Sequence, residues 1–188
     1  GNTGFNAIGL MISRIKSNDE LAKRTSTSIL TTNDKCDQAI AYTCYELGVQ
    51  CIKGSKLDVL DRYYRAAKEL QLEVIIRLTS DCPLIDPYEI LKLLDLHQVN
   101  GNDYTTNSFE GSTLIDGFDV EIFSFNALSK AHSESTLPSE REHVTFFFKP
   151  KYGFKCENVD LCLSFPYTRL TLDTPEDYQA ISSLINHI

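Results

Sequence analysis

Helical and extended patterns alternate along almost the whole chain, and this alternation constrains the fold more than any other feature of the sequence. Short segments rich in β-branched or apolar residues are typical of strands and cover residues 27–32, 49–52, 73–78, 103–106, 118–123, 154–164 and 169–172. Segments with helical spacing of apolar residues cover residues 5–16, 34–47, 58–70, 86–98, 124–133, 139–149 and 174–187. Strands joined by helices predict right-handed crossovers and an α/β fold with a three-layer, Rossmann-like, mainly parallel sheet.

The length of the chain indicates one domain. Its 188 residues contain no repeat or linker, so residues 1–188 are expected to share one core. The net charge of −8 argues against a nucleic acid as the main partner, because binding to its phosphates requires an excess of Lys and Arg. No apolar run has the length of a membrane span and no signal peptide is evident, so we expect a cytoplasmic protein. The six cysteines form no C-x-x-C pair, which favours buried thiols over a zinc site.

The chain opens with a helical pattern, and no strand pattern precedes it. In a doubly wound sheet, the first strand and the loop after it usually supply the phosphate site. Loss of an interior strand would leave backbone groups of its neighbours unpaired, which is costly. We therefore expect a truncated or edited sequence rather than a natural absence of this unit.

Two aspartates lie at the ends of predicted strands, where ligands of open α/β sheets bind. Asp81 follows the strand at 73–78, and Asp173 follows the strand at 169–172. Two such carboxylates can share one Mg²⁺ ion that bridges substrate oxygens. Each aspartate also has a simpler interpretation. Asp81 can close a turn before Pro83, and Asp173 can strengthen the start of the last helix by its charge.

The segment that begins with Gly54 leaves a strand and enters a helix. Ser55 and Arg62 in this segment can contact a base or a ribose. The alternative is an ordinary capped helix with Arg62 in solvent. Asp58 and Asp61 would compete with a phosphate at this helix start.

Two further segments offer polar residues. Asp119 and Glu121 are two positions apart on a predicted strand and therefore project from the same face. This face is either solvated or accepts hydrogen bonds from sugar hydroxyls. In the segment EREHVT, Arg141 can bind a carboxylate with two hydrogen bonds. His143 lies in a charged helix start, where a histidine is more often solvent-facing than catalytic.

Four stretches, taken in order, resemble the cytidylyltransferase family that activates the sugars of spore-coat polysaccharides and acidic sugars. The matching stretches are GSKLDVLDRYYRAAKELQLEVIIRLTSDCPLIDP, DGFDVEIFSFNALSKA, EREHVT and RLTLDTPEDYQAI. With the strand pattern from residue 27 onward, they cover nearly everything to the end of the chain. The opening helix, IGLMISRIK, is similar to the helix that follows the nucleotide loop in that family.

The resemblance implies a nucleotide-diphospho-sugar transferase fold of the GT-A-like type and a Mg²⁺-dependent reaction. A sugar hydroxyl would attack the α-phosphorus of CTP and yield a CMP-sugar and pyrophosphate, and the enzyme would be a homodimer. By resemblance, Asp81 and Asp173 are the metal ligands and Ser55 and Arg62 lie near the nucleotide. The other four polar residues, Asp119, Glu121, Arg141 and His143, lie near the sugar or the dimer contact.

The chain departs from the family pattern in two places. Ser80 stands where the family usually has Gly before the aspartate, and the first strand with its Gln-Ala-Arg and Lys-bearing loop is missing. The missing loop motivates a second hypothesis, a catalytically silent remnant that binds a partner or a nucleotide sugar. A third hypothesis, a GT-A glycosyltransferase, requires a D-x-D metal motif, and the sequence contains none.

Overall fold

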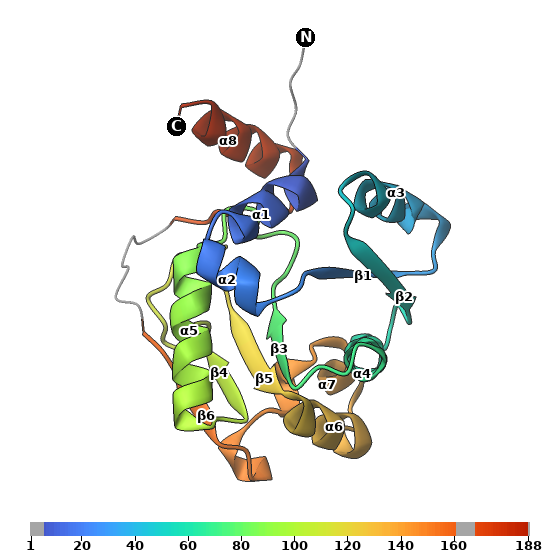
Figure 1. The fold of residues 1–188 in the computed structure, drawn as a ribbon, viewed down its shortest axis with the longest axis vertical. Helices are drawn as coiled ribbons and strands as arrows, with labels where there is room; N and C mark the ends of the chain where they lie inside the picture. Colours follow the sequence, from blue (N-terminus) through green and yellow to red (C-terminus); the bar gives the residue numbers. More distant parts are fainter. Residues whose placement is uncertain (1–5, 161–167, 188) are drawn as a thin grey trace.

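The computed structural model describes residues 6–160 and 168–187 (Figure 1). The helices are α1 (Ala7–Lys16), α2 (Asp19–Arg24), α3 (Gln38–Glu46), α4 (Val59–Glu69), α5 (Pro87–Asn100), α6 (Phe125–Glu134), α7 (Pro138–Glu142) and α8 (Pro175–Asn186). Short 3₁₀ turns cover Lys35–Asp37, Thr145–Phe147 and Pro150–Tyr152. The strands are β1 (Ser28–Thr32), β2 (Gln50–Gly54), β3 (Val74–Arg77), β4 (Tyr104–Thr106), β5 (Glu121–Ser124) and β6 (Cys156–Asn158).

The strands form two sheets. β1 pairs with β2 in parallel, with Ser28 opposite Gln50. The second sheet has the order β3-β5-β4-β6; β5 runs antiparallel to both neighbours, and β4 runs parallel to β6. Because β3, β4 and β6 share one direction, the predicted mainly parallel architecture is confirmed, with β5 as the reversed strand. The single shared sheet expected from the sequence is instead divided, since β1 and β3 are not paired with each other.

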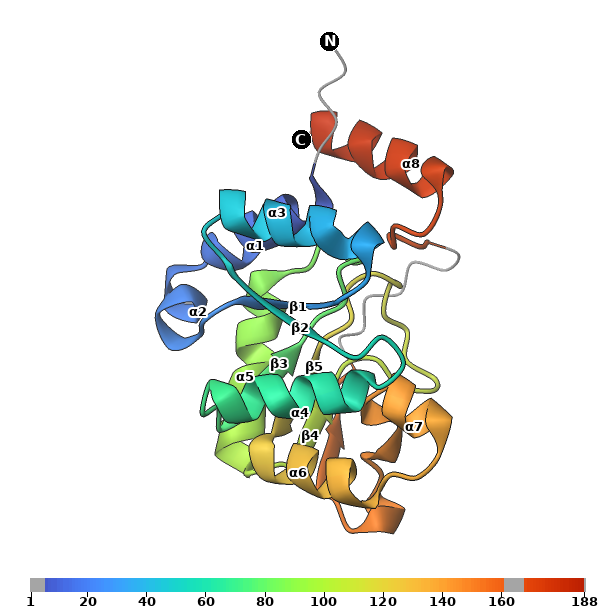
Figure 2. The same ribbon diagram turned by 90° about the vertical axis from the view of Figure 1, so that its right-hand side faces the viewer.

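Helices cover both faces of the second sheet, and the alternation of side chains along β5 shows why. Phe123 packs into a cluster that includes Leu60 of α4 and Leu128 of α6. The preceding residue, Ile122, projects to the other face and joins a cluster with Leu93 of α5. All five side chains have 0% exposure. Figures 1 and 2 show α5 on one side of this sheet and α4 and α6 on the other, which confirms the three layers.

Several element boundaries differ from the sequence-based expectations. The helix expected at 139–149 ends at Glu142, because Val144 has a φ of 54°, which no α-helix accepts. The strand expected at 169–172 makes only one bridge, between Asp116 and Arg169. The short helix α2 was not expected from the sequence; the side chain of Asn18 caps it by accepting from the N–H groups of Glu20 and Leu21.

Five of the cysteines lie in the described part, where they are free thiols, whereas Cys162 and the end of the strand expected at 154–164 lie outside it. No three His, Cys, Asp or Glu side chains within 6–160 and 168–187 gather closely enough to hold a metal by themselves. None of the helices in these ranges is both long and apolar enough to cross a membrane.

Candidate active site

Three segments that are far apart in the sequence meet beyond the carboxyl end of β3. The N–H of Leu172 donates to the carbonyl of Asp81 at 2.8 Å, and the N–H of Leu170 donates to the carbonyl of Asp116 at 2.8 Å. These two backbone bonds join the loop after β3 to the segment before β5 and to the segment that leads into α8. The segment that precedes Asp173 therefore lies against the loop that carries Asp81.

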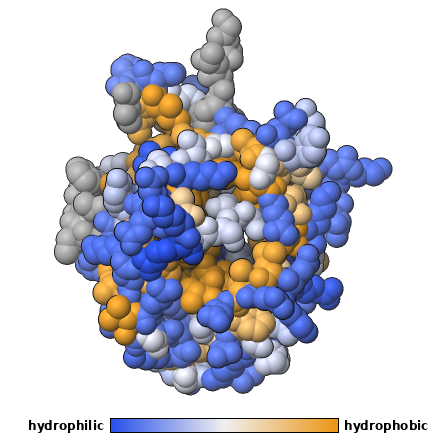
Figure 3. Space-filling model, viewed as in Figure 1, coloured by the Kyte–Doolittle hydropathy of each residue, from blue (hydrophilic) through white to orange (hydrophobic). Residues whose placement is uncertain are grey.

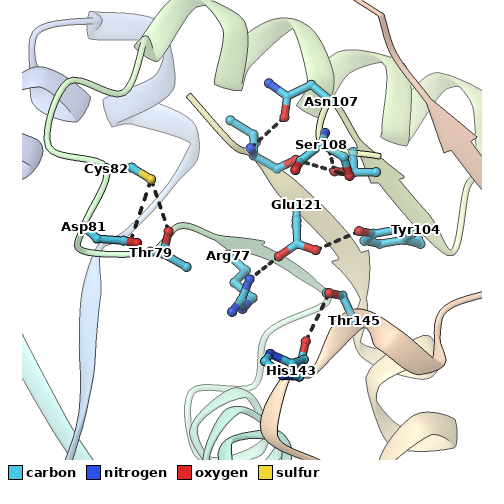
Figure 4. A network of polar contacts seen from close by, with 12 residues as sticks. Arg77, Thr79, Asp81, Cys82, Tyr104, Asn107, Ser108, Glu121, His143 and Thr145 are labelled. Atoms are coloured by element: carbon cyan, nitrogen blue, oxygen red, sulfur yellow. Dashed lines mark hydrogen bonds and ion pairs between the residues drawn. The ribbon is translucent and has the colours of Figure 1, made fainter. Parts of the chain in front are cut away.

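Asp81 lies in a tight turn that a buried cysteine stabilises. The N–H of Cys82 donates to the carbonyl of Thr79 at 3.1 Å, and the thiol of Cys82 lies 3.3 Å from the Thr79 hydroxyl and 3.8 Å from Asp81 Oδ1 (Figure 4). Burial raises the pKa of this thiol to about 12, and the negative charges of Asp81, Asp119 and Asp116 add to the effect. Several carboxylates thus surround this point, and such a site favours a cation.

Asp173 precedes α8 and does not cap it. Thr174 is the N-cap, and the carboxylate of Asp177 accepts hydrogen bonds from the N–H groups of Asp173 at 3.0 Å and Thr174 at 2.9 Å. The hydrogen bond from the Asp173 backbone is the largest cause of the lowered pKa of Asp177. The carboxylate of Asp173 accepts from the Thr171 hydroxyl at 3.0 Å and pairs with Arg169 at 3.0 Å. It is exposed at the site rather than used in the helix start.

These two aspartates fit a Mg²⁺ ion by their chemistry. Mg²⁺ is commonly held by one or two carboxylates and takes its remaining oxygens from water and from substrate phosphates. Among residues 6–160 and 168–187, the carboxylate of Asp81 makes one weak contact, with the thiol of Cys82, and the carboxylate of Asp173 is engaged through one oxygen, Oδ2. Both side chains therefore have free lone pairs with which to bind a hard cation.

Glu121 and Asp119 have different environments, although they are two residues apart. Arg77 and Glu121 face each other across the β3–β5 pair and form an ion pair, and the hydroxyl of Tyr104 donates to the other oxygen of Glu121 at 2.7 Å (Figure 4). Both oxygens of Glu121 are thus engaged by the protein. Asp119 precedes β5, and its pKa is raised. Burial is the largest cause and the negative charge of Asp116 adds to it, while a hydrogen bond from Ser108 acts in the opposite direction.

Ser55 and Arg62 lie at the start of α4. The hydroxyl of Ser55 accepts from the N–H of Asp58 at 3.0 Å. Arg62 lies across Gly54 so closely that a Cβ at Gly54 would approach Arg62 Cγ at 2.8 Å. Arg62 Nε is buried and has no hydrogen-bond partner in the described part of the chain. Arg62 therefore lies beside the end of β2.

Arg141 and His143 lie near the end of α7. Arg141 pairs with Asp58 at 2.8 Å and donates to the carbonyl of His132 at 3.0 Å, which ties α7 to α4 and α6. His143 is exposed, and its ring stacks on Phe146 with a centroid distance of 4.4 Å.

The structure does not bring all the predicted site residues into one group. It holds Leu172, the residue before Asp173, against the backbone of Asp81, with Asp119 near Cys82, and it places Arg62 beside the end of β2. Sequence reasoning missed Arg77 and Asp116. For Arg77 a signal exists, because an arginine in the otherwise apolar run VIIRL needs a charged partner when the strand is buried.

Comparisons with known proteins address the identity of this site. The model of the cytidylyltransferase family matches residues 11–186. An uncharacterized protein of Methanocaldococcus jannaschii is 32% identical over 190 residues, which cover 95% of this chain and 72% of that protein. The spore coat polysaccharide biosynthesis protein SpsF of Bacillus subtilis is 28% identical over 182 residues, covering 94% and 74%.

Solved structures agree with these sequence matches. A cytidylyltransferase from Leptospira borgpetersenii superimposes with a TM-score of 0.89 at 33% identity and covers 100% of this chain and 78% of its own. A CMP:2-keto-3-deoxy-manno-octonic acid synthetase complexed with CTP has a TM-score of 0.68 at 12% identity, over 98% and 89%, and shares the fold. The chain belongs to the cytidylyltransferase family, and its fold is that of the nucleotide-diphospho-sugar transferases.

Proposed function

We propose that this chain transfers CMP from CTP to a hydroxyl of an acidic sugar, with release of pyrophosphate, during the synthesis of a surface polysaccharide. The observation that carries the proposal is the backbone bond between Leu172 and Asp81, which places the residue before Asp173 against Asp81 beyond β3. Membership of the cytidylyltransferase family and the likeness to SpsF, a polysaccharide biosynthesis protein, support the substrate class. The fold shared with a synthetase that binds CTP supports the nucleotide.

The chemistry required is charge neutralisation and positioning. A sugar hydroxyl attacks the α-phosphorus in line with the departing pyrophosphate, so two negatively charged partners must approach each other. Asp81 and Asp173 would hold Mg²⁺, which supplies positive charge at the phosphate oxygens. Arg62, whose buried Nε beside Gly54 has no hydrogen-bond partner among the described residues, would place a second positive charge near the nucleotide.

The remaining predicted residues would act around this centre. Asp119 would accept hydrogen bonds from sugar hydroxyls. Glu121 would act through Arg77 and Tyr104, because both of its oxygens are engaged by these residues. His143, exposed and stacked on Phe146, would lie at the sugar side or at the contact of a homodimer. Light scattering on the purified chain tests the dimer.

The test of the proposal compares pyrophosphate release from CTP by three variants. Asp81→Asn and Asp173→Asn each remove one negative charge at the site, and each is expected to lower kcat by roughly 100-fold or more, the scale of losing one electrostatic contact in a reacting site. Asp95→Asn is the matched control, since Asp95 is an exposed carboxylate on α5 that pairs with Arg24. Full activity in both site variants would refute the metal assignment.

Binding is measured separately from turnover. A thermal-shift screen of CTP, UTP, GTP and ATP, each with and without Mg²⁺, is expected to show selective stabilisation by CTP with Mg²⁺, because ligands that bind only the native state raise Tm. Equal shifts for all four nucleotides would contradict the assignment of CTP.

In the part of the chain that the structure describes, β1 pairs only with β2 and β3 only with β5, and these two open edges favour a second candidate function. A chain with an incomplete central sheet can bind a nucleotide sugar or a protein partner without catalysing a reaction. Turnover of CTP by the 188-residue chain would exclude this candidate, whereas CTP binding without turnover would support it.

A further inference from the structure

A short segment with strand-like alternation carries Asp173 to the site. The N–H groups of Leu170 and Leu172 each donate to a backbone carbonyl of a neighbouring loop at 2.8 Å, so the main chain is fixed on both sides of Thr171. Residues two apart in an extended segment project from the same face. The side chains of Arg169, Thr171 and Asp173 accordingly lie together, and both of the first two contact the same oxygen of Asp173.

The hydroxyl of Thr171 is a buried donor directed at Asp173. Thr171 is 5% exposed, and its hydroxyl lies 3.0 Å from Oδ2 of Asp173. An ionised carboxylate only accepts hydrogen bonds, so the hydroxyl is the donor. A buried hydroxyl without a partner costs free energy, so this bond persists while the segment stays folded. Thr171 thus fixes one oxygen of a carboxylate whose side chain is 49% exposed.

The second contact to the same oxygen constrains it less. Arg169 pairs with Oδ2 of Asp173 at 3.0 Å and donates to Asp177 at 2.6 Å, but the side chain of Arg169 is 46% exposed. Ion pairs in solvent contribute little to holding one geometry, because both long side chains keep other conformations open. The buried hydroxyl of Thr171 is therefore the contact that selects one orientation of the Asp173 carboxylate.

The helix that follows Asp173 does not hold this carboxylate by packing. Of the residues of α8, only Ile181 is buried, and Figure 3 shows hydrophilic side chains on the outer side of this helix, at the upper left of the view. The contact from α8 to Asp173 is a backbone one, from the N–H of Asp173 to the carboxylate of Asp177 at 3.0 Å. The orientation of the Asp173 side chain thus depends on bonds within its own segment.

The other aspartate of the site has no comparable anchor. In the described ranges, the carboxylate of Asp81 contacts the thiol of Cys82 at 3.8 Å, and a thiol is a weak donor. No hydrogen bond or ion pair from these ranges reaches Oδ1 of Asp173, whereas its Oδ2 is held. The two carboxylates are therefore unequal, since that of Asp173 is oriented in advance and that of Asp81 is free to turn.

We propose that Thr171 is a positioning residue for the cation at this site. Its hydroxyl holds Oδ2 of Asp173 and leaves Oδ1 for the ion, so that Asp173 is the preformed ligand and Asp81 completes the coordination. Partners of this kind orient a ligand before the ion arrives, and their loss typically lowers metal affinity by roughly 10–100-fold. The inference rests on the proposed function, in which Asp81 and Asp173 hold Mg²⁺.

The test measures binding of Mn²⁺ to the 188-residue chain by electron paramagnetic resonance, without nucleotide and without turnover. Mn²⁺ takes the same oxygen ligands as Mg²⁺. Thr171→Val removes the hydroxyl and nearly keeps the shape of the side chain, and Thr171→Ser retains the hydroxyl. The matched control is Thr105→Val, because Thr105 is 0% exposed and its hydroxyl contacts His97 and Asn102.

Thr171→Val is expected to weaken Mn²⁺ binding about tenfold, and Thr171→Ser should stay within about twofold of the parent chain. Thr105→Val should lower Tm, since it also removes a buried hydrogen bond, and should leave the affinity for Mn²⁺ unchanged. Asp173→Asn should weaken binding more than Asp81→Asn, because it removes the preformed ligand. The reverse order would overturn the assignment of Asp173 as that ligand.

The variants also separate this inference from the proposed function. Parent-like binding in Thr171→Val, with weak binding in Asp173→Asn, would overturn the inference alone and leave the metal assignment standing. Equal losses in Thr171→Val and Thr171→Ser would overturn it as well, because the hydroxyl would not be the cause. Parent-like binding in both Asp81→Asn and Asp173→Asn would overturn the metal assignment, and the inference with it.

Discussion

The ion pair between Arg77 and Glu121 gives a prediction that separates a structural role from a role in substrate binding. The two side chains are 19% and 13% exposed, and Glu121 also accepts the hydroxyl of Tyr104. Burial lowers the pKa of Arg77, but the negative charge of Glu121 raises it, and the net shift is upward. The guanidinium therefore stays charged. Glu121→Gln removes the negative charge and leaves this positive charge nearly buried and without compensation.

The magnitude follows from the burial of the pair. Removing one partner of a fully buried ion pair costs about 3–5 kcal/mol, and the residual exposure here reduces this to about 2–4 kcal/mol. Replacing both partners by apolar residues of similar volume is often neutral. The double variant Arg77→Met/Glu121→Leu is therefore expected to be within about 1 kcal/mol of the parent chain, while each single variant is clearly destabilised.

The assay is urea unfolding at pH 7, followed by far-UV circular dichroism for the parent, both single variants and the double variant. A coupling free energy of at least about 3 kcal/mol is expected, at the upper end of the range for residues in direct contact. Additive effects of the two substitutions would refute the reasoning, because they would show that neither charge compensates the other. Full stability of Glu121→Gln with lost sugar binding would instead favour a direct contact with substrate.

Three further predictions concern single residues. Burial lowers the pKa of His97, whose ring lies 3.0 Å from the Thr105 hydroxyl, so the folded state favours the neutral ring. The contribution of His97 to stability is therefore present above pH 6.5 and is lost as the pH falls toward the lower pKa of the folded state. His97→Gln should flatten this dependence of the unfolding free energy on pH, measured by urea titrations. Hydrogen bonds from the backbone lower the pKa of Asp177, so its contribution to stability is present above pH 3.8 and is lost as the pH falls through the pKa of the folded state. Asp177→Asn should abolish this dependence of Tm on acid pH in thermal scans. Gly117 has a φ of 112°, and a Cβ there would lie 2.8 Å from the backbone of Leu170, whereas Gly111 has a φ of 89° and nothing within 4 Å of such a Cβ. Gly117→Ala should therefore lower Tm and activity more than Gly111→Ala. Equal effects would show that backbone strain at positive φ matters and the close approach to Leu170 does not.

The local signals in the sequence located most of the elements because those signals act over a few residues. Pro87 after the Asp86 cap and Pro175 after the Thr174 cap fix the starts of α5 and α8. The backbone contact between Leu172 and Asp81 agrees with the expectation that both segments end at one edge of the sheet, although residues 169–172 make one bridge there and not a strand.

Other features depend on contacts that the sequence does not show. The end of α7 is set by Val144, which is fully buried and held at positive φ by the packing around it. The partnership of Arg77 with Glu121 depends on the register between β3 and β5, which is set by the whole sheet. α2 escaped detection because it has only 6 residues, fewer than two turns of periodic pattern.

The reversed direction of β5 has a consequence for how relatives of this chain can diversify. A strand that runs opposite to its neighbours begins where they finish, so the segment 107–120, which leads from β4 into β5, lies at the same rim as the loop after β3. That segment connects two adjacent strands over the molecular surface, and its length is not tied to any helix. Insertions or deletions there can reshape the rim for a different acceptor while the framework beneath stays the same.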